Sequence, residues 1–153
     1  MTHLKPLDNQ RSHEYINQTM AKLKNRQVLQ IYQALLRLDP GLDPQNKGKS
    51  AFIFKAKVAY TLARNFRNIR PVIDDLERIR VETFKKYQPS LEVETLTGEA
   101  ARKFSVDFGE VLNEEVEFTF VKIDVNDLEL DKNTINVDIL AELMDVIIIG
   151  EIT

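Results

Sequence analysis

Three arginines and two asparagines recur at helical spacing in the stretch YTLARNFRNIRPVIDDLERIR. Arg64, Arg67 and Arg70 follow one another at intervals of three residues. Asn65 and Asn68 repeat that interval beside them. Residues three apart are neighbours on a helix, a guanidinium binds phosphate oxygens through its planar fork of donors, and an asparagine amide can hydrogen-bond a base or a ribose. The cluster therefore predicts a binding site for a phosphorylated ligand such as a small nucleotide.

The charges around Pro71 also suit a purely structural role. Arg64 and Arg67 would lie in the last turn of a helix that ends near the proline, and the acidic residues of 74–77 would lie near the start of the next helix. Helix dipoles favour cations at the C-terminal end and anions at the N-terminal end, by about 0.3–1 kcal/mol for each charge. We favour this role, in helix ends or in assembly, and keep ligand binding as the alternative.

The residue types that common catalytic and metal sites need are scarce. The chain has no cysteine, which excludes disulfides, thiolate metal sites and cysteine nucleophiles and fits a reducing, intracellular setting. The two histidines, His3 and His13, lie in a polar N-terminal stretch, and we interpret them as solvated side chains. Neither of the glycine-rich motifs that cradle phosphates occurs. We therefore expect no enzymatic activity, no cofactor and no metal.

The segment DVNDLELDKNTI, 124–135, resembles a calcium-binding loop only at its start. Asp124 and Asn126 occupy its first and third positions. The fifth, sixth and twelfth positions hold Leu128, Glu129 and Ile135, where such a loop needs an oxygen ligand, a glycine and a glutamate. The pattern indicates an acidic turn after a strand.

Length and composition indicate one domain with opposite charges in its two halves. The chain has 153 residues, of which 43% are hydrophobic, enough to bury a core. Residues 1–90 carry 17 Lys and Arg against 8 Asp and Glu, a net charge of +9, and residues 91–153 carry 4 against 16, a net charge of −12. We expect the halves to pack together in one fold or across subunits. Because phosphates repel so acidic a half, we expect no duplex nucleic acid as partner.

Apolar spacing predicts an α+β fold that is mostly helical, in which a flexible extension, 1–19, precedes a single domain, 20–153. Four segments have helical spacing: 25–38, 51–87, 98–115 and 136–148. The expected N-caps are Asn25, Ser50, Thr97 and Asn136. The long helix contains Pro71, so it either kinks there or restarts with Asn68 as a new N-cap.

Two segments alternate apolar and polar residues and predict a small antiparallel sheet. They are 20–25, MAKLKN, and 115–125, EVEFTFVKIDV. Their antiparallel pairing would set Lys22 and Lys24 near Glu115 and Glu117, and each such cross-strand pair contributes roughly 0.2–1 kcal/mol.

Two further segments leave alternatives open. Residues 90–98, SLEVETLTG, predict a short strand or a loop. The apolar run Val146–Ile149 either docks into the core or makes a subunit contact.

Three stretches together resemble a family of small uncharacterised bacteriophage proteins, common in phages of Gram-positive bacteria. They are KLKNRQVLQIYQALLRL, KAKVAYTLARNFRNIRPVIDDLERIRVETFKKY and LNEEVEFTFVKIDVNDLEL with VDILAELMDVI. The resemblance covers 20–148. It implies a phage context, and it carries no catalytic residues that could be transferred.

The resulting functional expectation is a non-enzymatic phage accessory protein, located in the cytoplasm of the infected cell and not in a membrane. It would act by self-association and by binding a host or phage protein. The alternative is a counter-defence protein that binds and sequesters a phosphorylated nucleotide signal through the cluster at 64–70.

Overall fold

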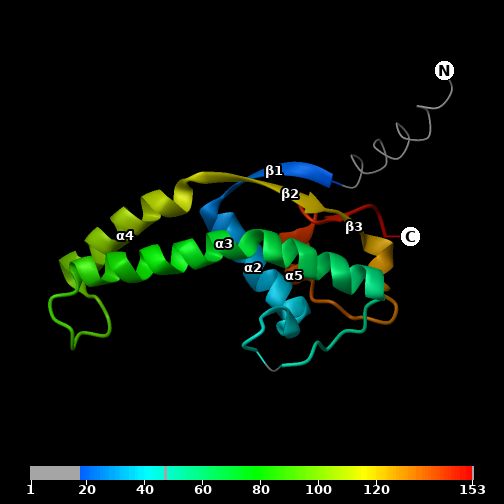
Figure 1. Cartoon of the computed structure of the whole chain (residues 1–153), viewed down its shortest axis with the longest axis horizontal. Helices are drawn as coiled ribbons and strands as arrows, with labels where there is room; N and C mark the ends of the chain where they lie inside the picture. The colour runs from blue at the N-terminus through cyan, green and yellow to red at the C-terminus, as the bar shows by residue number, and fades with distance from the viewer. Residues whose placement is uncertain (1–17, 47, 153) are drawn as a thin grey trace, which may run out of the picture.

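The computed structural model describes residues 18–46 and 48–152 and confirms the α+β, mostly helical class (Figure 1). The elements in chain order are β1 (Gln18–Lys24), α2 (Asn25–Leu38), η1 (Pro40–Leu42), α3 (Ala56–Tyr87), α4 (Gly98–Asn113), β2 (Glu115–Val121), β3 (Ile123–Asp124), η2 (Val125–Leu128), α5 (Val137–Leu143) and β4 (Ile148–Ile149). Most of the predicted extension, including both histidines, lies outside the described residues. Its last two residues belong to β1.

The predicted antiparallel sheet is confirmed in register. Strand β1 pairs with β2 so that Lys22 lies opposite Glu117 and Lys24 lies opposite Glu115. The Lys22 Nζ atom is 3.5 Å from a carboxylate oxygen of Glu115, diagonally across the pair. The apolar side of β2 packs into the core, since Phe118 and Phe120 are buried.

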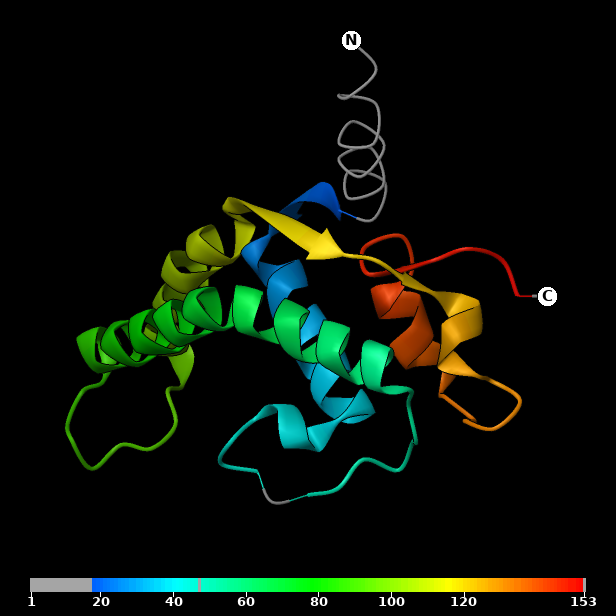
Figure 2. The same ribbon diagram turned by 45° about the vertical axis from the view of Figure 1, so that its right-hand side comes forward.

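Helix α3 is one continuous helix through Pro71. Of the two alternatives predicted at Pro71, the restart with Asn68 as a new N-cap is therefore wrong. Figure 2 shows that α3 arches between its two ends, as expected where a proline removes a backbone hydrogen bond from a helix. Among the helices of the described part, none combines the length and the apolar character that crossing a membrane requires.

The long helix begins at Ala56, five residues later than predicted. Ser50 does not cap it, because its hydroxyl donates to the carbonyl of Leu38 (2.6 Å) and accepts the N–H of Phe52 (3.1 Å). Buried Asn133 then holds residue 53 outside the helix, accepting its N–H at 3.0 Å and donating to its carbonyl at 2.9 Å. A distant side chain thus overrides the local helical pattern.

Asn25 is the first residue of α2 and not its N-cap, which is Lys24. The Asn25 side chain is buried, and its amide donates to the carbonyl of Val111 at 2.8 Å. Its backbone N–H donates to the carbonyl of Glu114 at 2.9 Å. The residue therefore fastens the start of α2 to the end of α4.

The C-terminal apolar run docks into the core. The predicted cap is confirmed, since Asn136 Oδ1 accepts the N–H of Asp138 at 2.8 Å, but α5 ends at Leu143 instead of continuing to residue 148. The β-branched residues that follow favour extended structure, and β4 pairs in parallel with β3, a contact that was not predicted. Ile147 and Ile148 are both 0% exposed.

Helix α4 runs back along the second half of α3, and together they form an arm, residues 74–113 (Figure 1). The arm has its own apolar contacts: the ring of Phe104 lies 6.4 Å from Phe84 and 5.7 Å from Phe108, centre to centre. The residues between the helices form a loop, which resolves the open alternative there. Thr97 is the N-cap of α4 by position, but its side chain makes no capping bond.

Candidate functional site

The structure brings four of the five predicted cluster residues to one surface hollow. It lies between α3 and β2, has a volume of about 620 Å³, and is called here the α3–β2 hollow. Its lining residues are Arg64, Asn65, Arg67, Asn68, Thr119 and Val121. Strand β2 was predicted, but its position beside the cluster was not, because that position depends on how the sheet packs against α3.

The two asparagines of the cluster bind the backbone of β2. Asn65 is 1% exposed, and its amide both donates to the carbonyl and accepts the N–H of Val121, each at 2.9 Å. Asn68 donates to the carbonyl of Thr119 at 2.8 Å. Because β1 pairs with only one side of β2, the other edge would carry unpaired backbone groups. The Asn65 amide, predicted to read a base or a ribose, is thus engaged by this edge.

Arg70 belongs to a different environment from the hollow. Its Nε donates to Asp74 at 3.0 Å, a further nitrogen lies 3.8 Å from Asp43, and the guanidinium lies 5.9 Å from the centre of the Phe66 ring. Partial burial lowers the pKa of Arg70, but the hydrogen bond to Asp74 and the neighbouring charges outweigh it and raise the pKa above its usual value. Arg70 therefore ties α3 to the η1 region.

Arg64 and Arg67 are the cluster residues left available for a ligand. Both are exposed, and neither makes an ion pair or a side-chain hydrogen bond with any residue of 18–46 or 48–152. They lie one turn apart on a helix whose neighbouring residues are fixed to β2. Two guanidinium groups on one wall of an open hollow can bind a phosphate group without paying for a broken ion pair.

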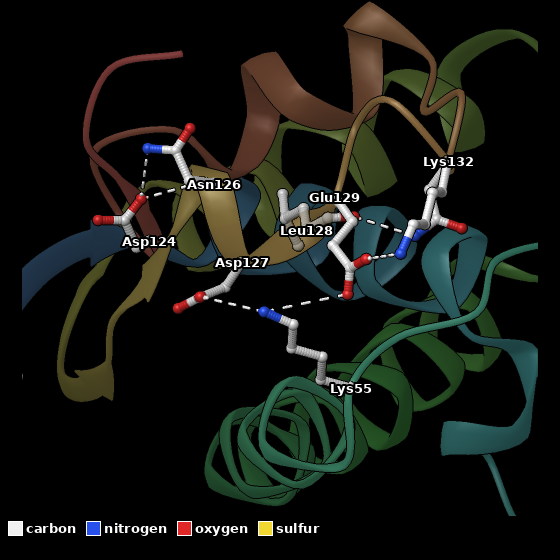
Figure 3. Close-up of polar contacts among 8 residues, drawn as sticks. Lys55, Asp124, Asn126, Asp127, Leu128, Glu129 and Lys132 are labelled. Atoms are coloured by element: carbon white, nitrogen blue, oxygen red, sulfur yellow. Dashed lines mark hydrogen bonds and ion pairs between the residues drawn. The ribbon is translucent and has the colours of Figure 1, made fainter. Parts of the chain in front are cut away.

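The acidic turn that begins at the end of β3 directs its carboxylates to the protein's own groups (Figure 3). Asp124 caps the short helix η2 through its side chain. Lys55 Nζ lies 4.0 Å from both Asp127 and Glu129, and Lys132 Nζ lies 2.8 Å from Glu129. The hydrogen bond from Lys132, followed by the charges of both lysines, lowers the pKa of Glu129. Within the described residues, no group of three or more His, Cys, Asp and Glu side chains is placed to hold a metal ion.

Comparison with known proteins adds no assignment. No protein-family model matches the chain, and neither a curated protein nor a solved structure matches it.

Proposed function

We propose that the protein is a non-enzymatic binding protein and that its ligand is a phosphorylated nucleotide held at the α3–β2 hollow. The supporting observation is a contrast among the arginines of α3. Arg70, Arg78 and Arg80 each have a carboxylate partner at 3.8 Å or less, whereas Arg64 and Arg67 have none among the described residues. Ion pairs between residues three or four apart stabilise a helix surface. The two arginines that lack them line the hollow.

The size of the hollow fits this class of ligand. Its volume of about 620 Å³ lies within the roughly 300–1,000 Å³ that is usual for small-molecule sites. Its open wall of cations would bind an anion by electrostatic attraction and hydrogen bonds. In the phage context that the family resemblance implies, we propose that binding sequesters a nucleotide signal of the host, a task that needs no catalytic group.

Removing both arginines is expected to weaken nucleotide binding about a hundredfold or more. A hydrogen bond to a charged group contributes about 1.5–3 kcal/mol, so each arginine lost should weaken binding about tenfold or more. The nucleotide to use is the one that gives the largest thermal shift with the wild-type protein. Isothermal titration calorimetry of the Arg64→Ala/Arg67→Ala variant with that nucleotide measures the loss of affinity. The matched control is Arg78→Ala, an exposed arginine that pairs with Asp75 and Glu82. No thermal shift with any cyclic or linear nucleotide would contradict the proposal.

A second candidate function is self-association through the arm, to which a partner protein could also bind. The C-terminal run that first suggested self-association is buried, but α4 offers another surface. Phe108 is its single buried residue, at 9% exposure, while Phe104, Val111 and Leu112 remain partly exposed. Val106 is 57% exposed. A helix with so little of its apolar surface covered supports contact with a second copy.

If the arm self-associates, the molar mass in solution should rise with concentration from one chain to two. Val106→Glu should shift this equilibrium toward the single chain, because a carboxylate would have to be buried in the contact. Val137→Glu is the matched control, since Val137 is a similarly exposed valine on α5. Multi-angle light scattering measures the mass. A single chain at every concentration would rule this candidate out.

A further inference from the structure

A stripe of cations and one aromatic residue extends the arginine pair toward the start of α3. Lys57, Tyr60, Arg64 and Arg67 follow at intervals of three, four and three residues, which places them on one face of the helix. All four are exposed. The nucleotide proposal uses two of them, and the other two have no assigned role.

Tyr60 is unusual among the aromatic residues of the described part. Its side chain is 63% exposed, whereas every other Phe and Tyr of 18–46 and 48–152 is at least partly buried. Burial normally stabilises a ring of this size. An exposed ring between cations is the arrangement with which proteins stack the bases of single-stranded nucleic acid.

The length of the stripe exceeds the reach of one phosphate group. Lys57 and Arg67 are ten residues apart, which corresponds to about 15 Å along a helix. Lys57 makes no ion pair with any described residue, in contrast to Lys55, which lies near Asp127 and Glu129. Three available cations over this distance suit a chain of phosphates better than a single nucleotide.

Two hollows that share a lining residue lie beside the stripe. A second hollow of about 180 Å³ adjoins the first, because Val121 lines both. Its lining includes Lys57 and Lys122, and the ammonium of Lys122 donates to the carbonyls of Asp145 and Val146. Burial lowers the pKa of Lys122, although the charge of Asp145 opposes this. The two hollows are therefore lined by the three cations of the stripe, and Tyr60 lies on the helix surface outside them.

Acidic residues lie at both ends of this surface. Asp124 and Asp127 line the second hollow, and Glu117 lies two residues before Thr119 on the exposed side of β2. Each would repel a phosphate chain that continued past the stripe. The charges therefore favour a short ligand and disfavour a duplex, whose second strand would extend over these carboxylates.

We propose that this face binds a short single-stranded oligonucleotide, with its phosphates on Arg64, Arg67 and Lys57 and a base stacked on Tyr60. The inference rests on the proposed function, because the same two arginines anchor the ligand. It adds to that function the length of the ligand, its single-stranded form and the residue on which a base stacks. A mononucleotide would engage the arginine pair alone.

The test is fluorescence anisotropy with a labelled single strand of about eight nucleotides, the matching duplex, and a mononucleotide as competitor. The single strand should bind at least about tenfold more tightly than the duplex or the mononucleotide. Tyr60→Ala should weaken its binding about five- to hundredfold, while Tyr60→Phe, which keeps the ring, should bind like wild type. Lys57→Ala should reduce the slope of log affinity against log salt concentration by about one unit, as expected for the loss of one phosphate contact. Circular dichroism checks that these exposed substitutions leave the fold intact.

The outcomes separate the two proposals. If mononucleotides bind through Arg64 and Arg67, but the single strand binds no more tightly and Tyr60→Ala has no effect, the oligonucleotide inference is overturned and the proposed function stands. If the duplex binds best, or if Arg64→Ala/Arg67→Ala leaves single-strand binding unchanged, the inference is likewise overturned. If no nucleotide of any length binds, both proposals fall.

Discussion

Deleting residues 146–153 is expected to abolish folding of the whole domain. The deletion removes Ile147 and Ile148, both 0% exposed, and the strand that pairs with β3. It also removes the carbonyl of residue 147, which accepts the N–H of Ile123 at 2.8 Å. Loss of one buried isoleucine costs about 2–5 kcal/mol, so loss of both approaches the 5–15 kcal/mol that is typical of total domain stability. Far-UV circular dichroism and urea titration measure the result.

A shorter deletion, of residues 151–153, is the matched control. Ile152 is 70% exposed, and the carbonyl of Glu151 accepts one surface hydrogen bond from Asn126, at 3.0 Å. Its loss should cost about 1 kcal/mol or less. A folded, monomeric product of the longer deletion would show that the apolar run serves a subunit contact instead of the core.

The elements that could be predicted from the sequence are those with a local signal. The helical stripe of 25–38 and the alternation in 115–121 follow from side-chain periodicity, which depends on neighbours a few residues away. The register of the sheet could also be predicted, because Lys22 and Lys24 match the charges of Glu115 and Glu117 when the strands run antiparallel. Local pattern and long-range pairing agree there, so the prediction holds.

The errors arise where a polar side chain bonds to backbone far along the chain. Asn133 holds residue 53, 80 positions away, and so delays the start of α3. Asn25 resembles a cap in the sequence but bonds to Val111, 86 positions away. The same side-chain amide serves as cap, ligand or backbone partner, and no local pattern distinguishes these uses. The role of each asparagine can be assigned only from its contacts in the folded structure.

The candidate site could likewise be predicted only where the signal is local. The spacing of Arg64 and Arg67 was enough to place them on one face of a helix. The engagement of Asn65 by β2 was not predictable, because it depends on which edge of the sheet meets α3. The cluster therefore contains two kinds of residue. Asn65 and Asn68 bind the helix to β2, and Arg64 and Arg67 lie exposed beside them.

Asn65→Ala is expected to destabilise the protein by about 2–5 kcal/mol. It removes both partners of Val121, whose N–H and carbonyl each bond to the Asn65 amide at 2.9 Å, and an unsatisfied buried group costs about 1–3 kcal/mol. Asn68→Ala is the control at the next turn. Asn68 is exposed and makes one such bond, so water can replace its amide and the cost should be about 1 kcal/mol or less. Equal urea midpoints for the two variants would contradict this account of the sheet edge.

Asn65→Asp separates hydrogen bonding from packing, because it keeps the shape of the side chain. As a carboxylate, aspartate could accept the N–H of Val121 but would face its carbonyl without a donor. Protonation supplies that donor, and burial also favours the neutral acid, so the folded-state pKa should rise above the unfolded value of about 3.9. The stabilising contribution of the protonated form is then complete below the unfolded pKa and is lost as pH rises through the folded pKa. The stability deficit relative to wild type should therefore be small in acid and grow toward neutral pH. A deficit independent of pH would mean that packing, and not the paired hydrogen bonds to β2, sets the requirement for asparagine at this position.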